Sequence, residues 1–189
     1  GDVSPGRSFT EVEDEAAKIP LGWVLLDNPW EGCNGTLTFQ TSRIPDPGGL
    51  IRQVHAVDAK GRAAAHTGTG CVDWCGHRVG EGFSVAGNML AGPQGVDRTF
   101  ETYAAGASLP LPTRLVNALD AGQAAGGDKR GKQSAALLIY STEDYPDYDL
   151  RVDDHPEPLA ELRRLLQMYE ADFAMFREVI PTRANPTGI

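Results

Sequence analysis

Glycine and polar residues gather in four segments of the chain, more densely than folding alone requires. The first segment, Thr67–His77, carries two cysteines, a tryptophan and a histidine between glycines. Glycine lets a backbone approach a ligand closely and expose its N–H groups to an anion. Trp74 and His77 are therefore candidate substrate-binding residues. A tight loop with Cys71 and Trp74 buried is the structural alternative.

The cysteines of this segment also raise the possibility of a zinc site. Cys71 and Cys75 have a spacing typical of zinc ligands, and His66 and His77 flank them. A structural zinc site usually needs a second such pair, which the sequence does not supply. Walker loops, dinucleotide fingerprints and the Gly-x-Ser-x-Gly motif are also missing from the sequence. We therefore expect no metal and no other cofactor, and zinc remains a distant alternative.

The second segment, Gly87–Gly92, offers hydrogen-bond donors for a developing negative charge. It ends a predicted strand, and its glycines let backbone N–H groups converge beside the side-chain amide of Asn88. Amide hydrolases need such donors at the oxyanion of their transition state. Asn88 is thus a candidate catalytic residue. The structural alternative is a plain turn with a capping asparagine.

The third segment is a charged, glycine-rich loop, residues 126–134, that leads directly into an apolar run. Loops at the mouth of a buried strand commonly carry functional residues. Arg130 can bind a carboxylate bidentately and Asp128 can orient it, so both are candidate catalytic residues. Gln133 and Ser134 are candidate substrate-binding residues. A solvated surface loop would explain the same composition.

The fourth segment, Asp149–Pro156, points to structure more than to chemistry. Asp153, Asp154 and His155 have the residue types of a metal or acid–base site. They directly precede a long predicted helix, however, where acidic side chains cap backbone N–H groups and complement the helix dipole. We predict that these residues cap the helix.

Hydrophobic periodicity predicts the elements that position these segments. The turn residues Asp58–Gly61 indicate a β-hairpin, and the glycine-rich residues 68–82 predict a loop. The continuous apolar run 134–140 predicts a central strand covered on both faces. The other β-prone runs are 21–26, 35–42, 51–59, 62–67, 83–90 and 149–152.

Helices are predicted where apolar residues recur at separations of three and four. The clearest pattern covers residues 156–178. Gly126-Gly127 ends the predicted helix 111–124. Hairpins interleaved with amphipathic helices indicate an α+β fold in which helices pack on antiparallel sheets, with a sandwich of two sheets as one possible arrangement. The other predicted helices cover residues 8–18, 97–105 and 111–124.

The composition limits the classes of partner. The chain has 189 residues, a length that suits one compact domain, and a net charge of −9 without a basic block. Such a surface repels phosphate backbones and anionic lipid, so we expect neither a nucleic-acid nor a membrane partner. The three cysteines fit reduced thiols, which favours the cytoplasm. We also expect a homo-oligomer.

The motifs, in this order along the chain, resemble the family of unknown function 1028 (DUF1028), which is Ntn-hydrolase-like (Ntn, N-terminal nucleophile). The resemblance extends from about Asp46 to about Tyr169. We therefore divide the chain into an atypical N-terminal segment 1–45, a family-like domain 46–180 and a tail 181–189. The matching motifs are Arg52–Val54, Val57–Arg62, His66–Gly68, Cys71–His77, Gly87–Gly92, Gly126–Leu138, Asp149–Pro158 and Glu161–Leu166.

The resemblance implies a fold and a reaction class. The fold would be an αββα sandwich, in which two antiparallel sheets are covered by helices. In Ntn enzymes an N-terminal Thr, Ser or Cys attacks an amide, and its own α-amine, with a pKa of about 7.7–8.0, accepts the proton. The resemblance thus implies a C–N hydrolase for a small amide or carboxylate ligand, with Asn88 as oxyanion donor and Asp128 and Arg130 beside it.

The beginning of the sequence departs from this pattern. Residue 1 is glycine, and the glycine–nucleophile junctions Gly32-Cys33 and Gly35-Thr36 give no convincing cleavage site. Three alternatives stay open. The nucleophile lies on a second polypeptide, or it lies on a part of the chain outside this sequence. The third alternative is a catalytically inactive binding or assembly protein with the same fold.

Overall fold

The computed structural model describes residues 23–26, 37–40, 51–58 and 60–188 of the chain. Within these ranges the strands form four antiparallel two-stranded sheets. The pairs are β1 (Trp23–Leu26) with β2 (Leu37–Gln40), β3 (Gln53–Val57) with β4 (Ala63–Thr67), β5 (Gly76–Gly80) with β6 (Phe83–Gly87), and β7 (Ala135–Ile139) with β8 (Tyr148–Val152).

Three α-helices lie in the described part of the chain. They are α2 (Gln94–Ala105), α3 (Leu111–Ala124) and α4 (Pro158–Met168). A π-helical turn, η1 (Tyr169–Phe173), and a 3-10 turn, η2 (Ala174–Glu178), continue α4. The predicted helix over residues 8–18 falls outside the described residues. The mixture of helices and small antiparallel sheets confirms the α+β class.

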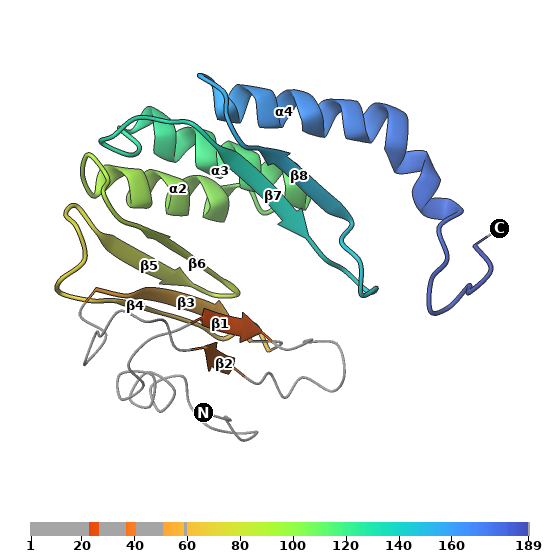
Figure 1. Cartoon of the computed structure of the whole chain (residues 1–189), viewed down its shortest axis with the longest axis horizontal. Coiled ribbons are helices and arrows are strands. Elements are labelled where there is room, and N and C mark those ends of the chain that lie inside the picture. Colours follow the sequence, from red (N-terminus) through yellow and green to blue (C-terminus); the bar gives the residue numbers. More distant parts are fainter. Residues whose placement is uncertain (1–22, 27–36, 41–50, 59, 189) are drawn as a thin grey trace.

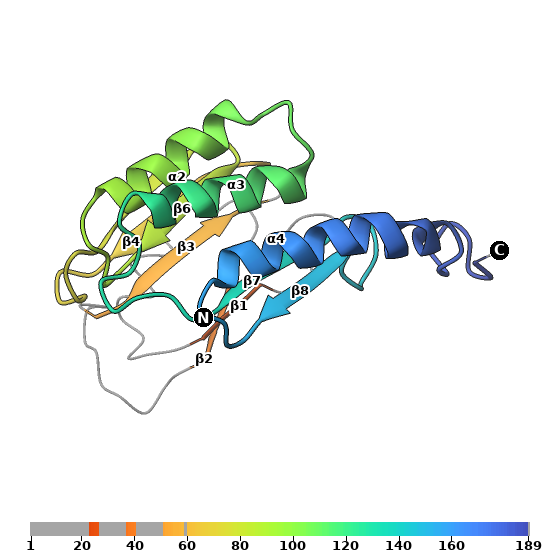
Figure 2. The same ribbon diagram turned by 90° about the horizontal axis from the view of Figure 1, so that it is seen from above.

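The elements are arranged in layers, with β6 and β7 in separate sheets. Helix α2 covers the β5–β6 hairpin, α3 packs against α2, and the β3–β4 hairpin lies on the other side of β5–β6 (Figure 1). Helix α4 covers the β7–β8 hairpin (Figure 2). Phe83 of β6 packs against the rings of Phe100 and Tyr103 on α2, with centroids 4.8 and 4.6 Å apart.

The predicted β3–β4 hairpin is confirmed, including its turn. Asp58 Oδ1 accepts hydrogen bonds from the backbone N–H groups of Lys60 and Arg62, at 2.9 and 2.8 Å. Gly61 has a φ of 75°, a conformation that glycine adopts without strain. The strand register then pairs Val57 with Ala63. The local turn chemistry alone therefore predicted this element correctly.

The predicted loop over residues 68–82 is wrong in part, because residues 76–80 form β5. Glycine is depleted in strands, and this segment is rich in it. Two aromatic rings cover the glycines in place of side chains. A Cβ on Gly76 would lie 2.5 Å from the Trp74 ring, and a Cβ on Gly80 would lie 2.4 Å from the Phe83 ring. The register with β6 therefore requires glycine at both ends of β5.

A compact apolar cluster joins α4 to the β7–β8 hairpin and to α3. The predicted helical stripe of α4 is confirmed, since Leu162 and Leu166 face this cluster. Leu162 and Val116 are fully buried. The other buried members of the cluster are Leu137, Ile139, Tyr148 and Val152.

Strand β7 alternates instead of being covered on both faces. Leu137 and Ile139 are buried under α4, whereas Leu138, on the opposite face of the strand, is 57% exposed. The prediction of a doubly covered central strand is therefore wrong for the residues that the structure describes. A continuous apolar run does not distinguish one covered face from two, because the second cover depends on elements distant in sequence.

The predicted capping of the last helix is wrong for Asp153 and Asp154, whereas His155 Nδ1 accepts a hydrogen bond from the backbone N–H of Glu157, directly before α4, at 3.0 Å. Helix α4 begins at Pro158 and its N-terminus has no side-chain cap. Asp154 instead accepts a hydrogen bond from Gln133 Nε2 at 3.1 Å, and Asp153 pairs with Arg151 at 2.8 Å. Pro158, in the first turn of α4, has no backbone N–H that needs a cap. The two acidic side chains contact Gln133 and Arg151 instead.

In the described ranges, none of the helices combines the length and the apolar character that crossing a bilayer requires.

Candidate functional site

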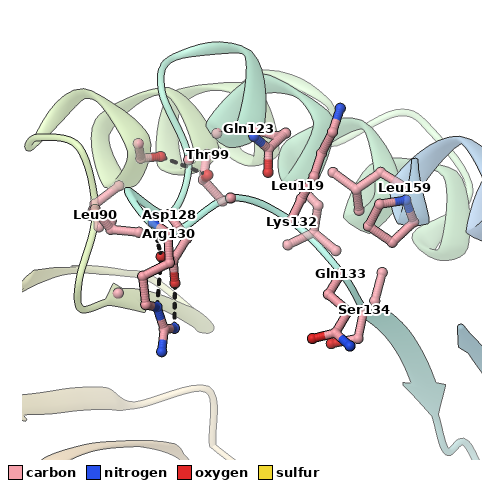
Figure 3. Close-up of a pocket in the computed structure, with 18 of the residues that line it drawn as sticks. Leu90, Thr99, Leu119, Gln123, Asp128, Arg130, Lys132, Gln133, Ser134 and Leu159 are labelled. Atoms are coloured by element: carbon pink, nitrogen blue, oxygen red, sulfur yellow. Dashed lines mark hydrogen bonds and ion pairs between the residues drawn. The ribbon is translucent and has the colours of Figure 1, made fainter. Parts of the chain in front are cut away.

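A cavity of about 960 Å³ separates β6 from β7 (Figure 3). Both strands contribute backbone to its walls, and α2 and α3 contribute side chains such as Thr99 and Leu119. The loop 127–134, which connects α3 to β7, runs along its rim. The cavity therefore lies between the β5–β6 hairpin and the β7–β8 hairpin.

The rim loop is held in place by the Gly87–Gly92 segment. The backbone N–H of Ala91 donates to Gly127 O at 2.9 Å, and the N–H of Lys129 donates to Met89 O at 2.9 Å. Leu90 and Asp128 form a β-bridge. Gly127 has a φ of 56°, which favours glycine at this turn. The structure thus brings together two segments that the sequence analysis treated separately.

Asp128 and Arg130 form one rigid unit at the cavity. Arg130 donates from Nε to Asp128 Oδ1 at 2.9 Å and from Nη2 to Oδ2 at 2.5 Å. The backbone N–H of Arg130 adds a third hydrogen bond to Oδ1 at 2.8 Å. These hydrogen bonds lower the pKa of Asp128 to about 2 and raise the pKa of Arg130. The carboxylate is therefore ionised near neutral pH and fixes the guanidinium in one orientation.

The pKa of Asp128 bears on whether this carboxylate suits binding or proton transfer. A general base works best with a pKa near the working pH, and the pKa of Asp128 lies far below it. The contacts of Asp128 suit it to positioning Arg130. Two thirds of the Arg130 side chain is exposed, at 66%, so its outer N–H groups can still donate to a ligand carboxylate.

Gln133 and Ser134 lie across the cavity mouth from Asp128 and Arg130 (Figure 3). Gln133 is fixed by its hydrogen bond to Asp154, and the neighbouring Lys132 pairs with Glu157 at the start of α4. The four candidate residues of the third segment therefore do line one cavity. Lys132 was missed in the sequence, although its place in the same charged loop was a usable signal.

Asn88 and His77 lie outside this cavity, on the other side of the β5–β6 hairpin. Asn88 directly follows β6, and unlike Gly87 it does not line the cavity. Asn88 Nδ2 instead donates to Gln53 Oε1 over 3.4 Å, a weak contact. His77 Nδ1 lies 2.8 Å from Thr67 Oγ1.

Gln53 is the centre of a polar seam between the β3–β4 and β5–β6 hairpins, a residue that the sequence analysis did not single out. Its Nε2 lies within hydrogen-bonding distance of Thr67 Oγ1 at 3.0 Å, Gly76 O at 3.1 Å and Gly87 O at 3.0 Å. A single side chain of β3 thus contacts β4, β5 and β6. The only signal in the sequence was a polar residue within an alternating run.

The seam also contains a second imidazole, that of His55. His55 Nδ1 lies 2.8 Å from Ser84 Oγ of β6. Partial burial of the ring, together with the charge of nearby His77, lowers the pKa of His55 below the ordinary 6.5. Neutral His55 is therefore the form that suits the folded seam.

The stability of the protein is expected to fall as the pH drops below 6.5. In the unfolded chain His55 takes up a proton near its ordinary pKa of 6.5, whereas the folded state resists protonation until a lower pH. The contribution of His55 is therefore complete above 6.5 and is lost below it. Urea unfolding between pH 5 and pH 8 measures this. The His55→Gln variant should flatten the dependence, and an unchanged slope in that variant would contradict the assignment.

Trp74 is an anchor of the loop and does not line the cavity. Its backbone N–H donates to Leu90 O at 3.2 Å, Leu90 donates back to Trp74 O at 3.0 Å, and its ring covers Gly76. Cys71 and Cys75 are free thiols. Within the ranges that the structure covers, no group of three or more His, Cys, Asp or Glu side chains could hold a metal ion. Nothing in these ranges therefore supports the zinc alternative.

Comparison with known proteins gives the family. The model of the family of unknown function DUF1028 matches residues 21–162. The chain belongs to the DUF1028 family. The crystal structure of protein SPO2555 from Silicibacter pomeroyi, also assigned to the DUF1028 family model, is similar at 32% identity with a TM-score of 0.66. The alignment covers 76% of this chain and 64% of that chain. No curated protein matches the chain.

Proposed function

We propose that this DUF1028 chain is the substrate-binding part of an Ntn-type amide hydrolase, and that the strand with the nucleophile occupies the cavity between β6 and β7. The observation that carries the proposal is the cavity itself, with a fixed Asp128–Arg130 pair at its rim. The resemblance of the motifs to an Ntn-like family supplies the reaction class. The substrate would be a small amide that carries a carboxylate.

The strand edges support a polypeptide as the missing component. In the described residues β6 pairs with β5 and β7 pairs with β8, and neither is paired on the side of the cavity. An unpaired edge presents backbone N–H and C=O groups that an extended segment can satisfy. Val96 and Leu119 line the helical side of the cavity and can receive every second side chain of such a segment.

The proposed chemistry needs only this strand and the rim. The terminal hydroxyl or thiol attacks the amide carbon, and the α-amine takes its proton. The proton passes to the leaving amine as the C–N bond breaks, and water then hydrolyses the acyl intermediate. Arg130 binds the substrate carboxylate, and Gln133 and Ser134 contact the substrate.

A catalytically inactive binding protein with the same fold is the second candidate. The observation in its favour is the Asp128–Arg130 pair, whose exposed guanidinium can bind a carboxylate without any nucleophile. In that case the cavity would hold a carboxylate ligand, and no chain of the assembly would begin with a nucleophile.

An electrophilic probe distinguishes the two candidates. The protein, isolated natively with whatever polypeptides accompany it, is treated with a β-lactone, and every chain is analysed by intact mass and N-terminal sequencing. The proposal expects one adduct per active site, on an N-terminal Thr, Ser or Cys. Blocking that α-amine beforehand should abolish labelling. If every chain begins with another residue, the Ntn mechanism is wrong and the binding candidate takes its place.

A further inference from the structure

The apolar stripe of the C-terminal helix continues beyond the hairpin that it covers. Leu162 and Leu166 of α4 are buried against β7 and β8, and Tyr169 is half-buried. The helical path then runs on past the strands (Figures 1 and 2). Phe173 and Phe176 continue the stripe but are 48% and 52% exposed. The helix therefore carries more apolar surface than its own hairpin can cover.

This overhang is fixed in place by specific contacts. The guanidinium of Arg177 lies over the Tyr148 ring at 4.2 Å and near the Tyr169 ring at 5.2 Å. Arg177 Nη2 also donates to Asp147 O at 3.2 Å. Tyr145 OH donates to Pro181 O at 2.8 Å, which ties the following segment to the β7–β8 turn. The exposed side chains thus stand on an anchored framework.

The size of the overhang suits a protein interface. We call it the C-terminal patch, and Met175, 68% exposed, is its most accessible member. With about 150–250 Å² per large aromatic side chain, the patch exposes several hundred Å². A stable dimer buries about 800 Å² per partner, of which a little over half is apolar, and the largest apolar patch on a monomer, about 300–600 Å², is often functional. The patch comprises Met168, Phe173, Met175, Phe176, Val179 and Ile180.

We propose that the C-terminal patch is a homodimer interface and that its occupant is a second copy of this chain. The exposed area fits the need of one side of a dimer, and aromatic residues and methionine are enriched at interface cores. A two-fold axis through the patch would bring two identical stripes together, so each copy covers the other.

The charges favour a protein over a lipid surface as the occupant. Glu170 and Asp172 are exposed on η1, among the residues of the patch. The whole chain carries a net charge of −9. An anionic membrane would repel this surface, whereas a protein interface places such charges at its solvated rim.

Sedimentation equilibrium of the purified full chain, from about 1 to 100 µM, tests the proposal. A dimer is expected, and Met175→Glu and Phe176→Gln should each raise the dissociation constant at least tenfold, since each removes buried apolar area. Leu109→Gln, which changes a side chain 41% exposed outside the patch, is the matched control and should leave the dimer intact. Circular dichroism verifies that the variants fold.

Three results would overturn the proposal. The first is a wild-type chain that stays monomeric throughout the concentration range. The second is a dimer that Met175→Glu and Phe176→Gln leave unchanged. The third is flotation of the wild-type chain with phosphatidylcholine–phosphatidylserine vesicles that these two substitutions abolish, which would identify a lipid surface as the occupant.

Discussion

Replacing Arg130 by alanine is expected to weaken binding of carboxylate ligands by about 10- to 100-fold, with the melting temperature nearly unchanged. A hydrogen bond to a charged group contributes about 1.5–3 kcal/mol to binding, and the outer N–H groups of Arg130 are available for it. The side chain is 66% exposed, so its loss leaves the core intact. Calorimetric titration with N-acetyl amino acids, which combine an amide and a carboxylate, measures the affinity.

Two further variants separate the role of the guanidinium from that of its charge. Arg130→Lys keeps the charge but loses the bidentate geometry, so it should recover only part of the affinity. Arg98→Ala removes an arginine of similar exposure, 67%, from an ion pair outside the cavity, and should have no effect on binding. A large loss of thermal stability in Arg130→Ala would instead identify Arg130 as a structural residue.

Replacing Leu162 by alanine should lower the free energy of unfolding by about 2–5 kcal/mol. Leu162 is fully buried between α4, the β7–β8 hairpin and α3, so its loss leaves a cavity that these elements cannot close. Chemical denaturation measures the effect. Leu138→Ala, on the exposed side of β7, should cost less than about 1 kcal/mol. Equal costs at the two positions would contradict the assigned core.

The sequence predicts those elements whose signals are local. The turn at Asp58–Gly61 and the apolar spacing of α3 and α4 depend on neighbours within a few residues, and the structure confirms them. The grouping of Asp128, Arg130, Gln133 and Ser134 was predictable for the same reason, because one short loop carries all four residues.

The errors concern features that depend on distant segments. Strand β5 contains glycines that the rings of Trp74 and Phe83 cover. The strand propensity of each residue does not include such contacts. The motif groups Asn88 with Arg130, whereas the structure places its side chain against Gln53, a residue 35 positions earlier in the chain. The contacts of Gln53 in the polar seam depend on the packing of one hairpin against another, and the residues next to Gln53 in the sequence do not indicate them.

Hydrogen exchange at the two cavity edges tests the central claim most directly. The isolated chain and the assembly isolated natively are compared by mass spectrometry over residues 85–87 and 134–136, which line the cavity. If a strand fills the cavity, these amides should exchange at least about tenfold more slowly in the native assembly. The β3–β4 hairpin serves as the internal reference. Equal exchange at both edges in the two preparations would contradict the claim that a strand binds between β6 and β7.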